Sequence, residues 1–245
     1  MATFVLVHGA WHGGWCWERI VPLLEAKGHR AIAPDLPGMG ADRTPLAEVS
    51  LERWADFTAD LVARAGEPAI LVGHSRGGLV ISEAAERVPD EIATLVYLTA
   101  FLLPPGGTLA GALAEGMEGT GASPTDLLVF SEDGSSMNVA PENVAPVFYN
   151  TTEPYWAIRA AANLVPEPAS TFVTPLVTSA ARFGRVPRIY VECTEDRAIP
   201  IGLQRHMHAA LPCRQVITMA TDHSPFYSAP TELSGVLDGI ALASG

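Results

Sequence analysis

The sequence has few positive charges and no long hydrophobic run. Lys and Arg number 15 against 27 Asp and Glu, which gives a net charge of −12 over 245 residues. This argues against nucleic acid or an anionic membrane as a partner, because both bind clustered Lys and Arg. The first residues lack the basic region and cleavage site of a secretion signal, and no apolar span could cross a bilayer.

Cysteine is also scarce. Cys16, Cys193 and Cys213 are odd in number and widely spaced, and none has a His or Cys neighbour at metal-ligand spacing. We interpret them as reduced thiols of a cytoplasmic protein without a metal site. The length and the 48% apolar content allow one domain with a full-sized core.

Apolar runs alternate with helical patterns along most of the chain. Strands are expected at 4–7, 30–33, 69–72, 93–98, 188–192 and 215–218. Helices are expected at 21–27, 51–64, 79–88, 201–211 and 231–243. Continuous apolar strands separated by helices predict an α/β fold, with a mostly parallel sheet of about six strands flanked by helices.

Residues 104–185 interrupt this alternation. The segment is rich in Gly, Pro, Ser and Thr, and its apolar residues occur in short pieces. A segment of this length inside a compact domain usually has its own structure and often acts as a lid. We therefore expect a core formed by residues 1–103 and 186–245 with an inserted cap at 104–185, where 127–130 form a short strand and 154–163 a helix.

The segment from Gly73 to Gly78, GHSRGG, follows an apolar strand and precedes a predicted helix. This is the context of a G-x-S-x-G nucleophile elbow. Glycines are needed there because the serine occupies a strained backbone conformation and the chain passes close to itself. The motif predicts Ser75 as a nucleophile at the carboxyl end of the sheet.

A serine nucleophile needs a histidine base, which in turn needs a carboxylate. In this motif's fold the triad order is Ser, then Asp or Glu, then His. His223 follows the last predicted strand, whereas the other two histidines after Ser75 lie within a predicted helix. Asp196 follows the preceding strand and is our choice of carboxylate, with Glu195 and Asp222 as competitors.

The oxyanion of the tetrahedral intermediate needs N–H donors. One donor is the backbone N–H of the residue after the nucleophile, here Arg76, and the second comes from the loop after the first strand. In that loop Ala10 follows the strand end, so Ala10 is the expected second donor. His12 is expected to make structural hydrogen bonds, because one catalytic base suffices.

Together these segments resemble the α/β-hydrolase superfamily, and within it the plant-type methyl esterases that act on methyl salicylate and methyl jasmonate. The resemblance rests on residues 4–17, 71–75, 193–196, 199–200 and 222–223, and it is weak from about 106 to 178. It implies a serine carboxylesterase for small, mostly apolar or aromatic esters. The same resemblance implies a triad of Ser75, His223 and Asp196, with Ala10 and Arg76 as oxyanion donors.

Two other functions remain alternatives. Hydroxynitrile lyases of the same branch share the triad but carry a threonine where this chain has Gly9, and a lysine where it has Ser224. A ligand receptor on a hydrolase scaffold is the second alternative. The triad chemistry calls for a small-molecule ester and no cofactor, and the resemblance favours a homodimer.

Three further side chains have candidate roles at the site. Phe101 and Trp156 are candidate substrate-binding residues. Arg76 departs from the plant esterases, which usually have an apolar residue there. Its side chain either contacts an acidic substrate group or a cap carboxylate, or belongs to a structural salt bridge, which we favour.

Overall fold

The computed structural model describes residues 1–116 and 124–244. Its centre is a six-stranded, fully parallel sheet in the order β2-β1-β3-β4-β8-β9. The strands are β1 (Thr3–Val7), β2 (Arg30–Ile32), β3 (Ala69–Ser75), β4 (Ile92–Ala100), β8 (Arg188–Cys193) and β9 (Gln215–Met219). The expected α/β fold is therefore confirmed, with all six predicted core strands present.

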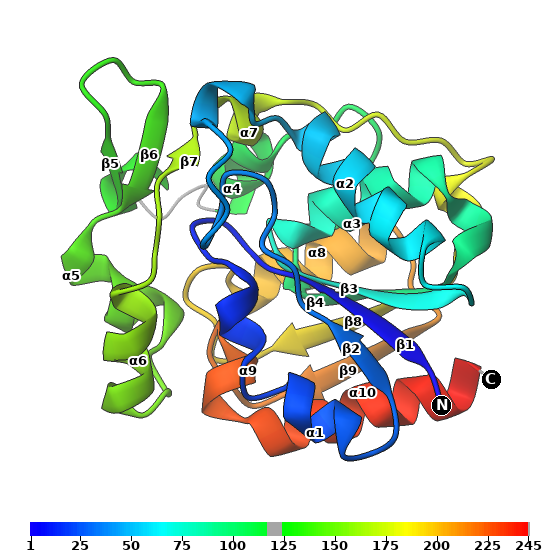
Figure 1. The fold of residues 1–245 in the computed structure, drawn as a ribbon. Coiled ribbons are helices and arrows are strands. Elements are labelled where there is room, and N and C mark those ends of the chain that lie inside the picture. The colour runs from blue at the N-terminus through cyan, green and yellow to red at the C-terminus, as the bar shows by residue number, and fades with distance from the viewer. Residues whose placement is uncertain (117–123, 245) are drawn as a thin grey trace.

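Helices cover both faces of this sheet, as Figure 1 shows. One layer contains α2 (Leu51–Ala63), α3 (Gly77–Arg87) and α8 (Ile201–Ala210), and the other contains α1 (Val21–Glu25), α9 (Pro225–Ser228) and α10 (Pro230–Ser244). With helices on both faces, β1 and β3 are buried along their whole length. This explains why their sequences are continuously apolar instead of alternating.

The helix α2 illustrates how the sequence sets an element. Its buried residues recur at helical spacing, and the Ser50 side chain caps the first turn by accepting from the Arg53 N–H. The buried stripe consists of Leu51, Trp54, Ala55, Thr58, Ala59 and Val62. Within the described residues, none of the helices has both the length and the apolar content that a bilayer crossing requires.

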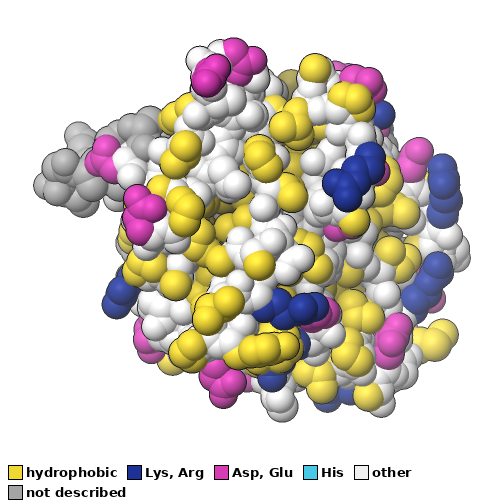
Figure 2. Space-filling view, turned by 60° about the vertical axis from the view of Figure 1, so that its left-hand side comes forward, with side chains coloured by type: hydrophobic (Ala, Val, Ile, Leu, Met, Phe, Trp, Pro, Cys, Tyr) yellow, Lys and Arg dark blue, Asp and Glu magenta, His cyan; other side chains and the backbone are white. Residues whose placement is uncertain are grey.

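Between β4 and β8 the chain builds a second, smaller assembly at the carboxyl ends of the strands (Figure 1). A three-stranded antiparallel sheet joins β5 (Leu128–Phe130), β6 (Ser136–Val139) and β7 (Glu167–Pro168). The helices of this segment are α4 (Leu109–Gly116), α5 (Pro141–Asn143), α6 (Pro154–Ala161) and α7 (Ser170–Val173). The side of the molecule that carries this assembly exposes many hydrophobic side chains (Figure 2).

Candidate active site

Ser75 lies at the turn between β3 and α3 in a left-handed conformation, with φ of +53°. A Cβ at Gly73 would lie 2.7 Å from the Gly77 carbonyl oxygen, and one at Gly77 would lie 2.8 Å from the His8 carbonyl oxygen. Side chains at both glycine positions are therefore excluded by neighbouring backbone. The surrounding chain holds the serine in a costly backbone conformation, as in a nucleophile elbow.

His223 and Asp196 form a buried pair at the ends of two neighbouring strands. His223 Nδ1 lies 2.7 Å from Asp196 Oδ2, which also accepts from the Thr99 hydroxyl. Asp196 Oδ1 accepts from the amides of Ala198 and Ile199 at 2.7 and 2.8 Å. The carboxylate is thus fixed by four donors. Because Nδ1 carries the proton that it shares with Asp196, Nε2 of the neutral imidazole is free to accept a proton or a hydrogen bond.

The two competing carboxylates are placed differently. Glu195 is exposed. Asp222 is buried but accepts from the Thr152 hydroxyl at 2.8 Å, the Ser228 hydroxyl at 2.8 Å and the Ser224 amide at 3.0 Å. Its side chain is therefore bound by these donors instead of by the imidazole, and it ties the His223 loop to Thr152, in the segment between β4 and β8.

His74 connects the serine turn to the histidine loop. Its Nε2 donates to the His223 carbonyl oxygen at 2.7 Å, and the two imidazole centroids are 4.6 Å apart. His74 is fully buried, and this burial holds its pKa well below the usual range, so the ring stays neutral. This contact was not predicted from the sequence, although a histidine directly before Ser75 was a visible signal.

Ala10 and Arg76 line the same cavity as Ser75. A Cβ at Gly9 would lie 2.9 Å from Ser75 Cβ, so the loop after β1 passes directly against the serine. No hydrogen-bond partner for either amide N–H occurs within the part of the chain that the structure describes. Both amide N–H groups are therefore free to donate, as the donors of an oxyanion site must be.

Two buried histidines fix the loop that carries Ala10. His8 Nε2 accepts from the Leu36 amide at 3.2 Å, so its Nδ1 carries the proton and donates to the Gly9 carbonyl oxygen at 2.8 Å. His12 Nδ1 donates to the Ala10 carbonyl oxygen at 2.6 Å. Burial lowers the pKa of His12 to about 4, so this ring is neutral and structural, as the sequence analysis expected.

The Arg76 side chain turns away from solvent into a buried ion pair. Its Nε lies 3.0 Å from Glu167 Oε1 on β7, and both side chains are fully buried. The guanidinium also lies 3.9 Å from the centroid of the Trp54 ring. The partner is thus a carboxylate of the segment between β4 and β8, and the contact is a buried salt bridge.

The cavity over Ser75 has a volume of about 680 Å³, counted with the part that opens to solvent. Apart from Ser75, Arg76 and Arg197, its walls are apolar, and they include residues of the segment between β4 and β8. The apolar walls are Ala10, Trp11, Phe101, Leu109, Leu113, Leu127, Leu128, Phe148, Phe172, Ala198, Ile199 and Pro200. An apolar cavity with a few polar groups is the usual form of a small-molecule site.

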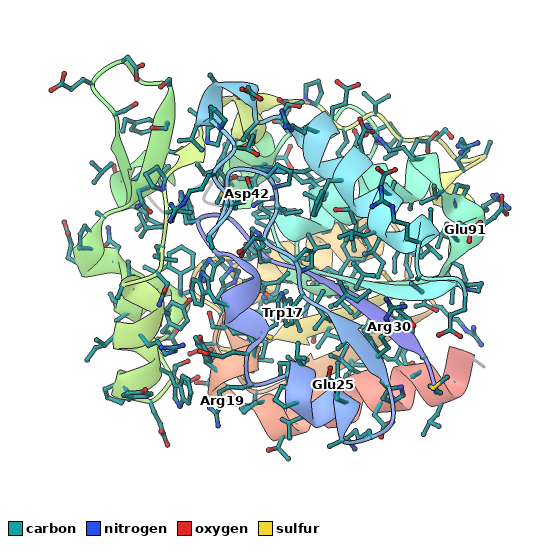
Figure 3. All side chains as sticks on the ribbon, in the orientation of Figure 1. Trp17, Arg19, Glu25, Arg30, Asp42 and Glu91 are labelled. Carbon is teal, nitrogen blue, oxygen red and sulfur yellow. The ribbon has the colours of Figure 1, made fainter. Side chains whose placement is uncertain are left out.

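Of the two predicted substrate-binding residues, the structure places Phe101 in the cavity wall but not Trp156. The Trp156 ring stacks on Tyr227, with centroids 5.1 Å apart, and packs against Arg19, whose Cζ lies 4.6 Å from its centroid. Arg19, labelled in Figure 3, also donates to the Tyr227 carbonyl oxygen. The Trp156 ring therefore lies outside the wall of this cavity, because α6 turns it toward α9.

The residues that the structure describes include no group of three or more His, Cys, Asp or Glu side chains suited to holding a metal ion. The three cysteines are free thiols, and burial raises the pKa of Cys213 to about 11. The polar groups around Ser75 are instead hydroxyl, imidazole, carboxylate and backbone amide.

The fold and the strained serine define an α/β hydrolase. Residues 4–236 match the model of the alpha/beta hydrolase family, and the chain belongs to that family. It is 34% identical over 249 residues to a pyrethroid hydrolase of Sphingobium wenxiniae, covering 99% of this chain and 89% of that protein. It is also 34% identical over 245 residues to methylesterase 1 of Arabidopsis thaliana, covering 94% and 92%.

A solved structure agrees with these sequence matches. The crystal structure of a pyrethroid hydrolase from Sphingobium faniae has a TM-score of 0.87 and 33% identity, covering 99% of this chain and 98% of that one. The expected relationship to the plant methylesterase branch and to ester-hydrolysing enzymes is confirmed.

Proposed function

We propose that this protein is a serine carboxylesterase in which Ser75 is the nucleophile, His223 the base and Asp196 the residue that orients His223. The observation that carries the proposal is the buried His223–Asp196 bond of 2.7 Å, formed next to the strained serine turn. The esterase relatives, which match almost the whole chain, support the same reaction. The Arg76 and Ala10 amides are the proposed oxyanion donors.

In the proposed reaction Ser75 Oγ attacks the ester carbonyl carbon while His223 Nε2 takes the hydroxyl proton. The carbonyl oxygen becomes an oxyanion and accepts from the Ala10 and Arg76 amides. Collapse of this intermediate expels the alcohol, which takes the proton from His223, and leaves an acyl-enzyme on Ser75. A water molecule, deprotonated by His223, then attacks the acyl carbon; the bond to Ser75 Oγ breaks, Ser75 takes the proton back from His223, and the carboxylic acid leaves.

We further propose that residues 104–185 form a cap over this site and that the substrate is a small, mostly apolar or aromatic ester. Leucines from α4 and aromatic side chains such as Phe148 and Phe172 line the cavity, so an apolar acyl or alcohol group would be buried there. Phe101 contributes from the end of β4. Trp156 is not included in this proposal.

Hydrolysis of a panel of methyl, aryl and short-chain esters tests the function. The wild-type protein should turn over apolar esters many times, and Ser75→Ala and His223→Ala should each lower kcat by at least about a thousandfold. His206→Ala is the matched control, because His206 is exposed on α8, and it should keep the wild-type rate. Equal rates for wild type and Ser75→Ala would overturn the proposal.

The lyase alternative is not favoured, because Gly9 and Ser224 stand where those lyases carry threonine and lysine. Assays of ester hydrolysis and cyanohydrin cleavage on one preparation separate the two activities. A receptor would instead give a stoichiometric burst of product followed by slow release, whereas an enzyme gives rapid multiple turnover.

We also propose that the protein acts in the cytoplasm and assembles as a homodimer, and that it does not bind nucleic acid. The excess of acidic residues and the free cysteines support the first and last points. Exposed apolar side chains of the cap, including Phe130 and Ile158, support association. Light scattering during size-exclusion chromatography should give twice the chain mass of 25.9 kDa.

A further inference from the structure

The direction of the Ala10 N–H is set by the carbonyl at the other end of the same peptide bond. In a trans peptide the C=O and N–H point in opposite directions, so fixing one fixes the other. The Gly9 carbonyl oxygen accepts from Arg76 Nη2 at 3.0 Å and from His8 Nδ1 at 2.8 Å. The Arg76 side chain therefore holds the peptide whose N–H is one proposed oxyanion donor, while the Arg76 backbone N–H is the other.

The next peptide, between Ala10 and Trp11, is held by the cap. The Trp11 N–H donates to Glu167 Oε2 at 3.0 Å, and the Trp11 carbonyl oxygen accepts from the Val165 amide at 3.0 Å. Trp11 has φ of +61°, a conformation that is costly for an aromatic residue and persists only where the surroundings impose it. Residues 165–167 thus impose the backbone shape of the oxyanion loop.

Arg76 and Glu167 join these two restraints. Glu167 Oε1 lies 3.0 Å from Arg76 Nε and accepts from the Thr171 hydroxyl at 3.1 Å, while Oε2 takes the Trp11 amide. The two residues are 91 positions apart in sequence and fully buried. A buried ion pair often adds little to stability compared with apolar residues of the same volume, so stability alone does not account for it.

We propose that the Arg76 side chain and Glu167 are positioning residues for the oxyanion hole. Arg76 holds the Gly9 carbonyl, Glu167 holds the Trp11 amide, and between them they aim the Ala10 N–H at the carbonyl oxygen of the substrate. The positive guanidinium also polarises the Gly9–Ala10 peptide and makes its N–H a stronger donor. This inference rests on the proposed esterase function, and it links the cap to the donor geometry.

A purely structural ion pair would behave differently. It would connect the cap to the core, and replacing both partners with apolar residues would restore stability and activity together. Positioning residues affect the transition state, in which the oxyanion exists, more than the bound ester. A structural role and a positioning role are therefore distinguished by whether kcat or KM changes, and by whether the affinity for an analogue of the tetrahedral intermediate changes.

The test compares the wild type with Arg76→Leu and with the double variant Arg76→Leu/Glu167→Leu. Arg76→Leu keeps the backbone N–H but leaves Glu167 buried without its positively charged partner, so this variant is also expected to lose stability. The double variant removes both charges and keeps the test informative if the single variant fails to fold. Arg159→Leu is the control, because it cuts another ion pair between cap and core, to Glu18, away from the oxyanion loop.

We expect the double variant to fold but to unfold at a lower temperature than the wild type, because the buried Trp11 N–H loses its acceptor. It should lose about ten- to a hundredfold in kcat with KM changed by less than about twofold. Affinity for an aryl trifluoromethyl ketone should fall by a similar factor. Ser75 Oγ adds to the carbonyl carbon of this ketone, the hydroxyl proton of Ser75 passes to His223, and the ketone oxygen becomes an oxyanion. Affinity for an ether of the same size should not change, and Arg159→Leu should behave as wild type.

Wild-type kcat and ketone affinity in a folded double variant would overturn the positioning role and leave the esterase proposal intact. A parallel loss of affinity for ketone and ether would also overturn it, since that pattern reports a collapsed cavity. Absence of Ser75-dependent ester hydrolysis in the wild type would overturn both proposals, and the two kinds of failure are therefore distinguishable.

Discussion

The Asp196 carboxylate is held by donors from several parts of the chain. Its two oxygens accept from one imidazole, one hydroxyl and two amides, so every partner of the carboxylate is a hydrogen-bond donor. Thr99, one of those donors, has φ of +37° and lies where the register of β3 and β4 shifts. The irregular end of β4 thus delivers a hydroxyl to the carboxylate that orients His223.

Replacing Asp196 by Asn should reduce activity strongly while keeping the shape of the side chain. The amide group cannot accept from His223 Nδ1 and from the hydroxyl and both amides at once, so the imidazole loses its fixed tautomer. We expect kcat to fall by about 10³–10⁴. Glu195→Gln, at the exposed neighbour, is the control for steady-state kinetics, and equal losses in the two variants would contradict this assignment.

The sequence could predict Ser75, His223 and Asp196 as a triad because chain order and strand ends restrict the choice of base and acid, and their catalytic roles stay a prediction. It could not find Glu167, because the cap carries several carboxylates and nothing local marks the one that reaches Arg76. The direction of the Trp156 ring could not be predicted either, since the helical pattern of 154–163 does not determine which way the ring turns. That direction is set by stacking on Tyr227.

At the scale of elements, the parallel strands and the segment that interrupts them were predictable, but the strand pairing inside that segment was not. Buried strands give continuous apolar runs, whereas the cap sheet is made of strands of two to four residues. Only the segment around 128–130 was expected to be a strand. Its partners, β6 and β7, depend on pairing between distant segments, which short sequences do not specify.

The contact between α3 and β1 depends on the lack of a side chain at Gly77. A Cβ there would lie 2.8 Å from the His8 carbonyl oxygen and 2.9 Å from that of Val7. Both are backbone atoms, so relieving the contact would require a shift of the main chain. Gly77→Ala should therefore lower the free energy of unfolding by about 1–3 kcal/mol. Chemical denaturation measures this change.

Gly202, within α8, is the matched glycine for that experiment. A Cβ at this position would meet nothing within 4 Å. Gly202→Ala should raise stability by about 0.4–1 kcal/mol, because alanine lowers the entropy of the unfolded chain and favours helix. If both glycine variants were equally destabilised, the tight packing between α3 and β1 would not be the cause.

For the whole molecule, the buried histidines connect folding to pH. Burial lowers the pKa of His12 to about 4 and holds those of His8 and His74 well below the usual range. The unfolded chain then binds more protons than the folded one below about pH 6.5, so stability is full above that pH and falls as pH drops toward 4. For His12 alone the loss is about 3 kcal/mol.

His12→Asn should make the unfolding free energy less dependent on pH between about 6.5 and 4. The wild type and the variant are compared by urea denaturation across this range. His206→Asn, at an exposed site on α8, should keep the wild-type slope. A His12 variant with an unchanged slope would mean that another group controls acid unfolding.

The account as a whole depends on the alcohol of Ser75 becoming covalently attached to the acyl group of an ester. The most direct measurement is intact-mass spectrometry after rapid acid quench with a slowly deacylated aryl ester, followed by peptide mapping. We predict one acyl group per chain on the peptide that contains Ser75, and none in Ser75→Ala. Acylation at another residue, or ester turnover without an adduct and without loss in Ser75→Ala, would contradict it.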